Sequence, residues 1–119
     1  MGMKHEVRHF VSATRNSLAG LKAALKETAF RQEILGGILH YVMIVLVNVP
    51  LTVKMLLGIL WPLIMSMELI NSALEQIVDY ISPEWNEFAK KAKDMSSAAV
   101  GILIVLTILI WGYVFLCLP

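Results

Sequence analysis

Residues 98–118 read AAVGILIVLTILIWGYVFLCL and contain no charged side chain. A helix of about 20 residues crosses the hydrocarbon core of a bilayer, so this stretch alone predicts a transmembrane helix. Two further apolar segments precede it, at residues 30–49 and 51–70, and Asn48 and Pro50 mark a turn between them. The sequence therefore predicts an all-α integral membrane protein with three spans.

The composition supports a membrane environment. Hydrophobic residues make up 58% of the 119 residues, charged residues make up 16%, and the mean hydropathy is +0.73. A water-soluble domain of this size needs more polar surface to cover its core. A net charge of +1 argues against a nucleic-acid-binding protein, which would carry a concentrated basic surface. We expect one domain over residues 1–119, with the single Cys117 facing lipid.

An amphipathic segment precedes the spans, at residues 5–28. Its apolar side chains recur at intervals of three and four residues, at Val7, Phe10, Val11, Leu18, Leu21 and Leu25. Basic side chains occupy other faces, so we expect a helix on the membrane surface with its basic face toward phosphate headgroups. The segment lacks the unbroken apolar core and the small-residue cleavage site of a signal peptide.

The distribution of Lys and Arg predicts the orientation. Six basic residues precede the apolar core of the first span, which begins at Ile34, and three lie between the second and third spans, whereas only Lys54 lies near the turn between the first and second. By the positive-inside rule, the N-terminal segment and the 79–94 loop are expected to face the cytoplasm. Pro119 is expected on the opposite side.

Ionisable side chains from all three spans are predicted to meet at the cytoplasmic boundary of the membrane. Counting roughly 20 residues from Leu51 brings the second span to this boundary near Glu68. At about 100° per residue, one face of that helix carries a polar stripe, formed by Glu68, Asn71, Glu75 and Asp79. The other spans bring further polar residues to this depth, namely Glu27, Arg31, Gln32, Glu33, Lys93 and Asp94. Carboxylates at a membrane rarely lack a role.

A divalent-metal and phosphate site is the favoured interpretation. Neighbouring carboxylates repel unless a cation or a proton lies between them. Mg²⁺ often takes one or two protein carboxylates and completes its shell with nucleotide phosphates. Lys93 could neutralise phosphate charge, and a free carboxylate could act as general base on an alcohol. The alternative is that these charges are helix ends held by salt bridges, and Lys90 and Lys91 are interpreted as topology determinants.

Other features are interpreted structurally. The sequence contains no GxxxxGK[ST] phosphate loop and no HRD or DFG motif. Gly36-Gly37 is expected to permit close helix packing, and His40 to form a hydrogen bond between helices. Pro62 is expected to bend the second span or loosen its hydrogen bonding. Trp61 and Trp111 are interpreted as residues of an aromatic belt.

Three motifs together carry a family resemblance: KETAFRQE (26–33), MELINSALEQIVD (67–79) and AKKAKDMSSAAV (89–100). In this order and spacing, they resemble the bacterial membrane diacylglycerol kinase family over nearly the whole chain. The resemblance implies an ATP-dependent kinase that uses Mg²⁺ to convert diacylglycerol to phosphatidic acid in phospholipid metabolism. It also implies a homotrimer in the cell inner membrane, with active sites shared between neighbouring subunits.

The resemblance also implies residue roles. Glu68 matches the general base on the lipid hydroxyl, and Glu27 and Glu75 match metal-binding carboxylates. The implied nucleotide-binding residues are Arg8, Asn16, Glu27, Asn71, Glu75, Glu84, Trp85, Asn86, Lys93 and Asp94. The implied lipid-substrate residues are Ala29, Phe30, Arg31, Gln32, Glu33, Lys54, Glu68 and Ser97. The N-terminal segment departs from the family pattern, since Asn16 stands where many members have tyrosine and Leu25 where tryptophan is usual.

Two other functions remain open at this point. An undecaprenol kinase of the same superfamily would perform the same chemistry on a polyprenyl alcohol, although the string AFRQE favours diacylglycerol. A non-enzymatic small membrane oligomer, such as a cation-conducting ring lined by Glu68 and Glu75, would need charged residues near the bilayer midplane. In this sequence the charges instead cluster at one face of the membrane.

Overall fold

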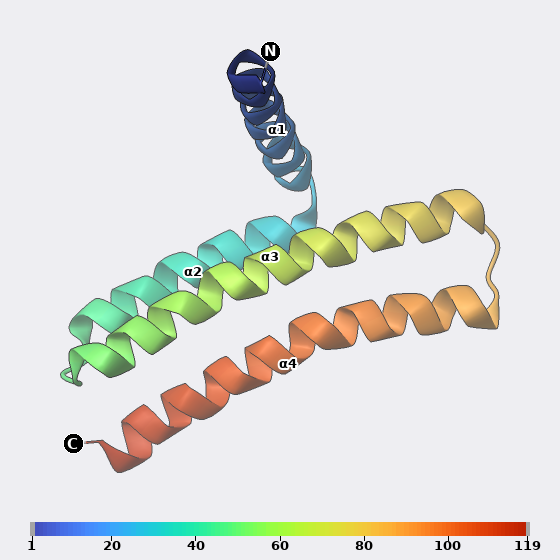
Figure 1. The fold of residues 1–119 in the computed structure, drawn as a ribbon. Coiled ribbons are helices and arrows are strands. Elements are labelled where there is room, and N and C mark those ends of the chain that lie inside the picture. The colour runs from blue at the N-terminus through green and yellow to red at the C-terminus, as the bar shows by residue number, and fades with distance from the viewer. Residues whose placement is uncertain (1, 119) are drawn as a thin grey trace.

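Residues 2–118, which the computed structural model describes, form four α-helices and no strand. They are α1 (Gly2–Ala24), α2 (Thr28–Leu46), α3 (Leu51–Ile81) and α4 (Glu87–Cys117) (Figure 1). The last three are long and apolar enough to cross a membrane. The predicted all-helical fold with three spans is confirmed, while the expected position of Pro119 lies outside the described residues.

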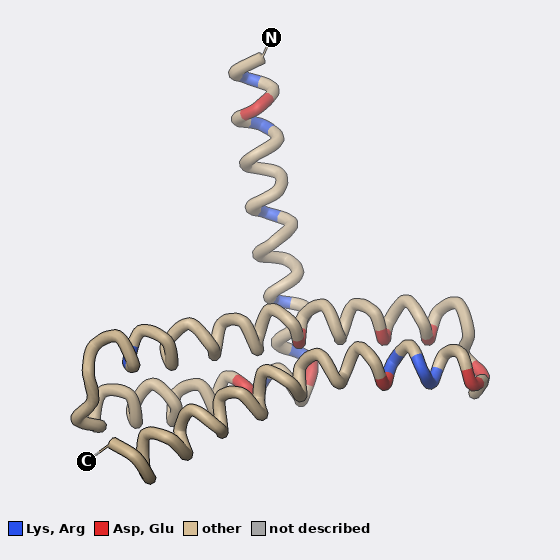
Figure 2. The backbone as a smooth tube through the Cα atoms, turned by 60° about the horizontal axis from the view of Figure 1, so that its bottom comes forward, with Lys and Arg blue, Asp and Glu red and all other residues tan. Residues whose placement is uncertain are grey.

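Two of the apolar helices continue past their predicted spans. The sequence predicts spans at 51–70 and 98–118, whereas α3 ends only at Ile81 and α4 begins already at Glu87. The apolar pattern ends where side chains become polar, but the backbone hydrogen bonds of a helix do not depend on side-chain polarity. Figure 2 shows charged residues along these extensions and along α1. We call residues 68–97, which include both extensions, the polar end of the molecule.

The first two helices end earlier than the sequence predicts. The amphipathic helix, expected at 5–28, ends at Ala24 and is followed by a short turn. The first span, expected at 30–49, is α2, which begins at Thr28 and ends at Leu46. A proline follows shortly after, and proline favours extended backbone in the residue before it, so the helix ends ahead of the turn.

The amphipathic helix α1 stands crosswise to the three apolar helices (Figures 1 and 2). Arg31 closes the turn that joins it to α2, because its Nη1 donates to Leu25 O at 2.9 Å and its Nη2 to Thr28 Oγ1 at 3.4 Å. This turn lies beside the middle of α3, since Ala24 and Glu27 line a cavity together with α3 side chains. A membrane crossed by the apolar helices would therefore have α1 along its surface, as expected for an amphipathic helix.

His40 of α2 connects all three apolar helices. It is buried, its Nε2 pairs with Leu57 O of α3 at 2.8 Å, and its Nδ1 accepts from the Trp111 indole N–H of α4 at 3.1 Å. Because Nδ1 accepts, Nε2 carries the ring proton and donates it to Leu57. The predicted hydrogen-bonding role of His40 is confirmed. Trp61 and Trp111 also direct their N–H groups to protein acceptors, contrary to the aromatic-belt interpretation, because interhelical packing brings acceptors within their reach.

Pro62 lies inside α3 without ending the helix. A proline lacks the N–H that would bond the carbonyl four residues earlier, which here is Gly58 O. Tyr41 of α2 supplies the missing partner, since its hydroxyl donates to Gly58 O at 2.8 Å. The hydrogen bond lost within α3 is thus replaced by one between two helices.

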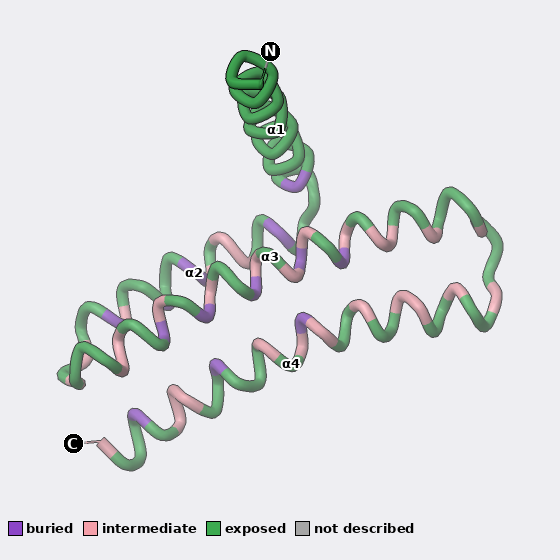
Figure 3. Tube along the Cα trace, in the orientation of Figure 1, coloured by how far each residue is buried: buried purple, intermediate pink, exposed green. Residues whose placement is uncertain are grey.

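Most apolar side chains of the single chain are exposed. Figure 3 shows exposed residues along every helix, with buried ones confined to the faces where the helices meet. Leu57 and Ile64 of α3 are the largest fully buried side chains among the described residues. The remaining apolar faces are available to lipid or to other protein.

Candidate functional site

Two acidic side chains from different helices meet inside the molecule. Glu68 of α3 is only 7% exposed, and the carboxyl of Glu33 from α2 lies next to it. Oε2 of Glu33 is buried and has no hydrogen-bond partner within residues 2–118. Burial of acidic groups without basic partners is costly, so this pair is a strong candidate for function rather than for stability.

Asn71 links α3 to α4 one turn from Glu68. It is 7% exposed, its Nδ2 donates to Glu75 Oε1 at 3.4 Å, and its Oδ1 accepts from the Ser96 hydroxyl at 2.7 Å. The two bonds fix which way the amide points. Within the predicted stripe, Asn71 and Glu75 are therefore connected, and Glu68 lies one turn from Asn71 on the same face.

Ser96 is a site residue that sequence reasoning missed. The resemblance implied its neighbour Ser97 as a lipid contact; Ser97 is exposed, while Ser96 bonds Asn71 between α4 and α3. Adjacent residues on a helix point about 100° apart, so the rotation of α4 against α3 decides which serine faces inward. A pair of adjacent serines at the right depth was the available signal, but it did not distinguish the two.

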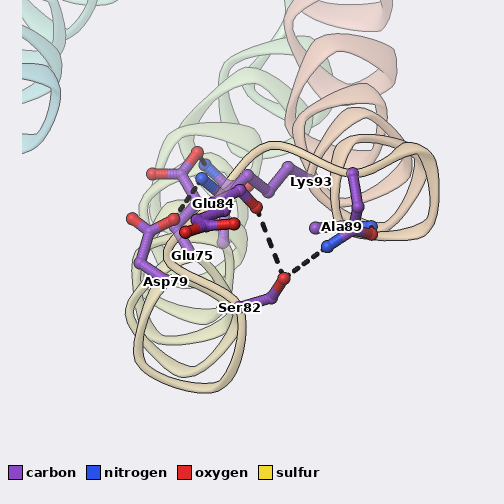
Figure 4. A network of polar contacts seen from close by, with 8 residues as sticks. Glu75, Asp79, Ser82, Glu84, Ala89 and Lys93 are labelled. Carbon is purple, nitrogen blue, oxygen red and sulfur yellow. Dashed lines mark hydrogen bonds and ion pairs between the residues drawn. The ribbon is translucent and has the colours of Figure 1, made fainter.

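A pocket of about 280 Å³ lies where α3 and α4 are joined. Residues from both helices and the loop line it, among them Asp79, Ser82, Glu84, Trp85, Asn86 and Lys93. Figure 4 shows Lys93 reaching across to Asp79, with which it forms an ion pair. Asn86 caps α4 by accepting from Ala89 N at 2.8 Å and donates to the Ser82 hydroxyl. The loop residues predicted to contact nucleotide thus surround one pocket with Lys93.

A second cavity, of about 500 Å³, lies between the end of α1 and α3. Glu27 borders it together with Ser72 and Gln76. Glu27 is exposed and its carboxylate makes no capping bond to α2, so it is free to bind a ligand from this cavity. Phe30, also among the predicted lipid contacts, is buried beside the turn.

Several predicted site residues lie apart from this cluster in the single chain. Lys54 donates to Val45 O at 3.4 Å at the α2–α3 turn, which is about 21 Å from Glu68 along α3. Arg8 and Asn16 are exposed on α1, and Asp94 pairs with Lys90 at 2.6 Å on the surface. The surface pairs of α4 fit the salt-bridge interpretation of those particular charges. Ala29 and Gln32 are exposed on α2 beside the turn that Arg31 closes.

The carboxylates do not form a complete metal site within one chain. In the part of the chain that the structure describes, no three His, Cys, Asp or Glu side chains are close enough to hold an ion. Glu27 and Glu75 offer the hard oxygen ligands that Mg²⁺ prefers, but two carboxylates leave most of its six positions to phosphate oxygens or water. The oxygen donors of these two carboxylates are of the kind that suits a hard cation.

The fold and the site define a small multi-pass membrane protein with an acidic and amide cluster at one level of its apolar helices. The family model described as prokaryotic diacylglycerol kinase matches residues 15–115, which include α2, α3 and nearly all of α4. The chain belongs to the prokaryotic diacylglycerol kinase family, as its motifs indicated.

Relatives named diacylglycerol kinase occur in several bacteria. One from Haemophilus influenzae is 39% identical over 115 residues, which cover 87% of this chain and 89% of the relative. One from Escherichia coli is 39% identical over 102 residues, or 85% of this chain and 84% of the relative. One from Helicobacter pylori is 43% identical over 103 residues, which cover 83% of this chain and 78% of the relative. The similarity thus extends over most of both chains in each pair.

Proposed function

We propose that this protein transfers the γ-phosphate of MgATP to the hydroxyl of diacylglycerol, giving phosphatidic acid. The observation that carries the proposal is the buried Glu68 beside Glu33 and Asn71, at the level where α1 leaves the apolar helices. A lipid whose acyl chains lie in the bilayer presents its hydroxyl at this depth. The family supports the reaction class, and the names of the relatives support diacylglycerol as the substrate.

Glu68 is proposed as the general base. Its carboxylate takes the proton of the lipid hydroxyl, the oxygen attacks the γ-phosphorus in line, and ADP leaves from the opposite side. Burial helps this step because the carboxylate is not solvated by bulk water. Asn71, with its amide held by Glu75 and Ser96, is proposed to orient the phosphate chain.

Glu27 and Glu75 are proposed to hold Mg²⁺ together with the nucleotide. The ion, when bound, would neutralise charge on the phosphates. Lys93 is proposed to move from Asp79 to the phosphates, which costs little because an exposed ion pair contributes only about 0–1 kcal/mol. Glu84, Trp85, Asn86 and Asp94 are proposed nucleotide contacts from the loop and α4, and Arg8 and Asn16 from α1.

We infer that the working enzyme is a homotrimer with shared active sites. In support, a single chain leaves long apolar faces uncovered, and its described residues bring no three metal-ligating side chains together. A neighbouring copy could bring its own carboxylates to a site that one chain leaves incomplete. We further propose that the protein lies in the inner membrane with its polar end in the cytoplasm, from the distribution of Lys and Arg.

The test is a phosphotransfer assay on the purified protein in bicelles with Mg²⁺ and ATP. Short-chain diacylglycerol and undecaprenol are supplied in parallel, and phosphorylated lipid is quantified. Diacylglycerol should be the better substrate, and Glu68→Gln should abolish transfer while the oligomer remains intact by size-exclusion chromatography. Glu87→Gln, the same change at an exposed carboxylate paired with Lys91, is the matched control. Preferential phosphorylation of undecaprenol, or full activity of Glu68→Gln, would refute the corresponding part of the proposal.

A further inference from the structure

We propose that Trp61 is a positioning residue for this site. It holds the turn of α2 that carries Glu33 against α3, so that the Glu33 carboxyl stays beside Glu68. The role rests on the proposed function and deepens it, because it assigns to an apolar residue in the membrane the task of arranging the acidic pair.

The first observation is a hydrogen bond between the two helices. The indole N–H of Trp61 donates to the backbone carbonyl oxygen of Glu33 at 2.9 Å. Trp61 and Glu68 lie seven residues apart on α3, which places them two turns apart on the same helix face. One side chain thus ties the backbone of Glu33 to the helix face that carries Glu68.

The second observation is the space that two glycines leave for the indole. A Cβ atom at Gly37 would lie 2.7 Å from Cδ1 of Trp61, and one at Gly36 would lie 3.0 Å from its Cζ2. Carbon atoms without a bond between them prefer separations of about 3.5–4.0 Å, so a side chain at Gly37 would displace the ring. The absence of side chains at both positions lets α2 approach α3 with the indole between them.

The third observation is a ring contact one turn further along α2. The His40 ring lies against it with the ring centroids 4.9 Å apart and the planes tilted by 30°. His40 is itself fixed by its bonds to Leu57 and Trp111. Trp61 is therefore held between α2 backbone and an immobilised ring, while its remaining side borders a cavity of about 380 Å³.

The consequence concerns the environment of Glu68. Among the described residues, Oε2 of Glu33 has no hydrogen-bond partner, and its close acidic neighbour is Glu68. Electrostatic interaction between buried groups is strong and depends on their separation. A shift of the α2 turn would therefore change the separation of the two carboxyl groups and the placement of Glu68, even though Trp61 itself touches no reacting atom.

The experiment measures steady-state kinetics of lipid phosphorylation. Trp61→Phe keeps an aromatic ring but removes the N–H donor, and it should lower kcat on the order of tenfold, because small misplacements in an active site are costly. KM for ATP should stay at the wild-type value. Gly37→Ala should lower kcat in the same way. Gly58→Ala is the matched control with unchanged kcat, since a Cβ there meets Tyr41 at an ordinary 3.9 Å.

A double variant separates positioning from a general loss of structure. If Trp61 acts through Glu33, Trp61→Phe should have little further effect on kcat in a Glu33→Gln background, because the two changes disturb one arrangement. Independent, multiplicative losses of kcat in the double variant would overturn the inference. A wild-type kcat in Trp61→Phe would also overturn it. The Trp61→Phe result alone decides the matter if Gly37→Ala fails to fold. A wild-type protein without lipid kinase activity would overturn the proposed function and this role together, whereas losses confined to the variants leave the function standing.

Discussion

The hydroxyl of Ser96 donates to Oδ1 of Asn71 across 2.7 Å and joins α4 to α3 beside the buried Glu68. The bond leaves the Asn71 amide nitrogen to face Glu75. Ser96 of α4 therefore sets the orientation of the Asn71 side chain. α3 carries Asn71 itself, with the amide nitrogen on the side proposed to face the ligand. Any rotation of α4 against α3 would break this bond and release the amide.

Ser96→Ala should reduce both stability and activity. It leaves Oδ1 of a buried Asn71 without its donor, which costs about 1–3 kcal/mol in proteins. The Asn71 side-chain amide would then be free to flip. The rate of phosphotransfer should fall several-fold, and KM for ATP should rise. Thermal unfolding in detergent and kinetics at varied ATP measure the two effects. Ser66→Ala is the control, because that exposed hydroxyl bonds only Pro62 O of its own helix, and an equal loss in both variants would contradict the assignment.

Glu75→Gln should raise the Mg²⁺ concentration needed for half-maximal activity. The amide keeps the size of the side chain and can still accept from Asn71, but it loses the negative charge that attracts the cation. Activity is measured against free Mg²⁺ at a fixed ATP concentration. Glu27→Gln should act in the same direction, whereas Glu87→Gln should leave the Mg²⁺ dependence alone. An unchanged Mg²⁺ requirement in both Glu75→Gln and Glu27→Gln would remove them from the metal site.

Asp79→Asn and Lys93→Met should have opposite consequences for ATP binding. The two residues form an ion pair whose side chains are 35% exposed at Lys93 and 61% exposed at Asp79, so its loss should change stability by less than about 1 kcal/mol. Lys93→Met removes the proposed phosphate contact and should raise KM for ATP. Asp79→Asn frees the lysine and should leave KM unchanged or lower it. A rise of equal size in both variants would show that the pair acts as a structural unit.

Tyr41→Phe should destabilise the protein only while Pro62 is present. The tyrosine hydroxyl bonds Gly58 O, which Pro62 leaves without its helical donor, so its removal should cost about 0.5–1.5 kcal/mol. In a Pro62→Ala background, the alanine N–H can bond Gly58 O, and Tyr41→Phe should then cost much less. Unfolding of the four proteins in detergent gives the coupling energy. Equal costs in the two backgrounds would contradict this explanation.

His40→Leu should be more damaging alone than together with Trp111→Phe. The single change leaves the Trp111 N–H unpaired within the apolar helices, and an unsatisfied donor there costs about 1–3 kcal/mol. Removing the donor as well relieves that cost. The unfolding midpoint of the double variant should therefore lie above the value expected from adding the two single effects.

The sequence by itself determined the architecture and the level of the site. Spans of sufficient length and apolarity have few alternatives to a helix in a membrane, because every backbone polar group must be bonded internally. Helical periodicity also put Glu68, Asn71 and Glu75 on one face, since residues three and four apart are neighbours on any α-helix. Both conclusions depend on properties of one helix at a time.

Only the tertiary structure decided which side chains meet across helices. The choice of Ser96 over Ser97, the bond from Trp61 to Glu33 and the pairing of Lys93 with Asp79 all depend on the rotation and register of packed helices. Those quantities come from the shapes of two surfaces together, such as the space that Gly37 leaves for an indole. A periodic pattern determines which residues share a face of one helix, but it carries no information about the neighbouring helix. The contact partners were therefore found only in the folded chain.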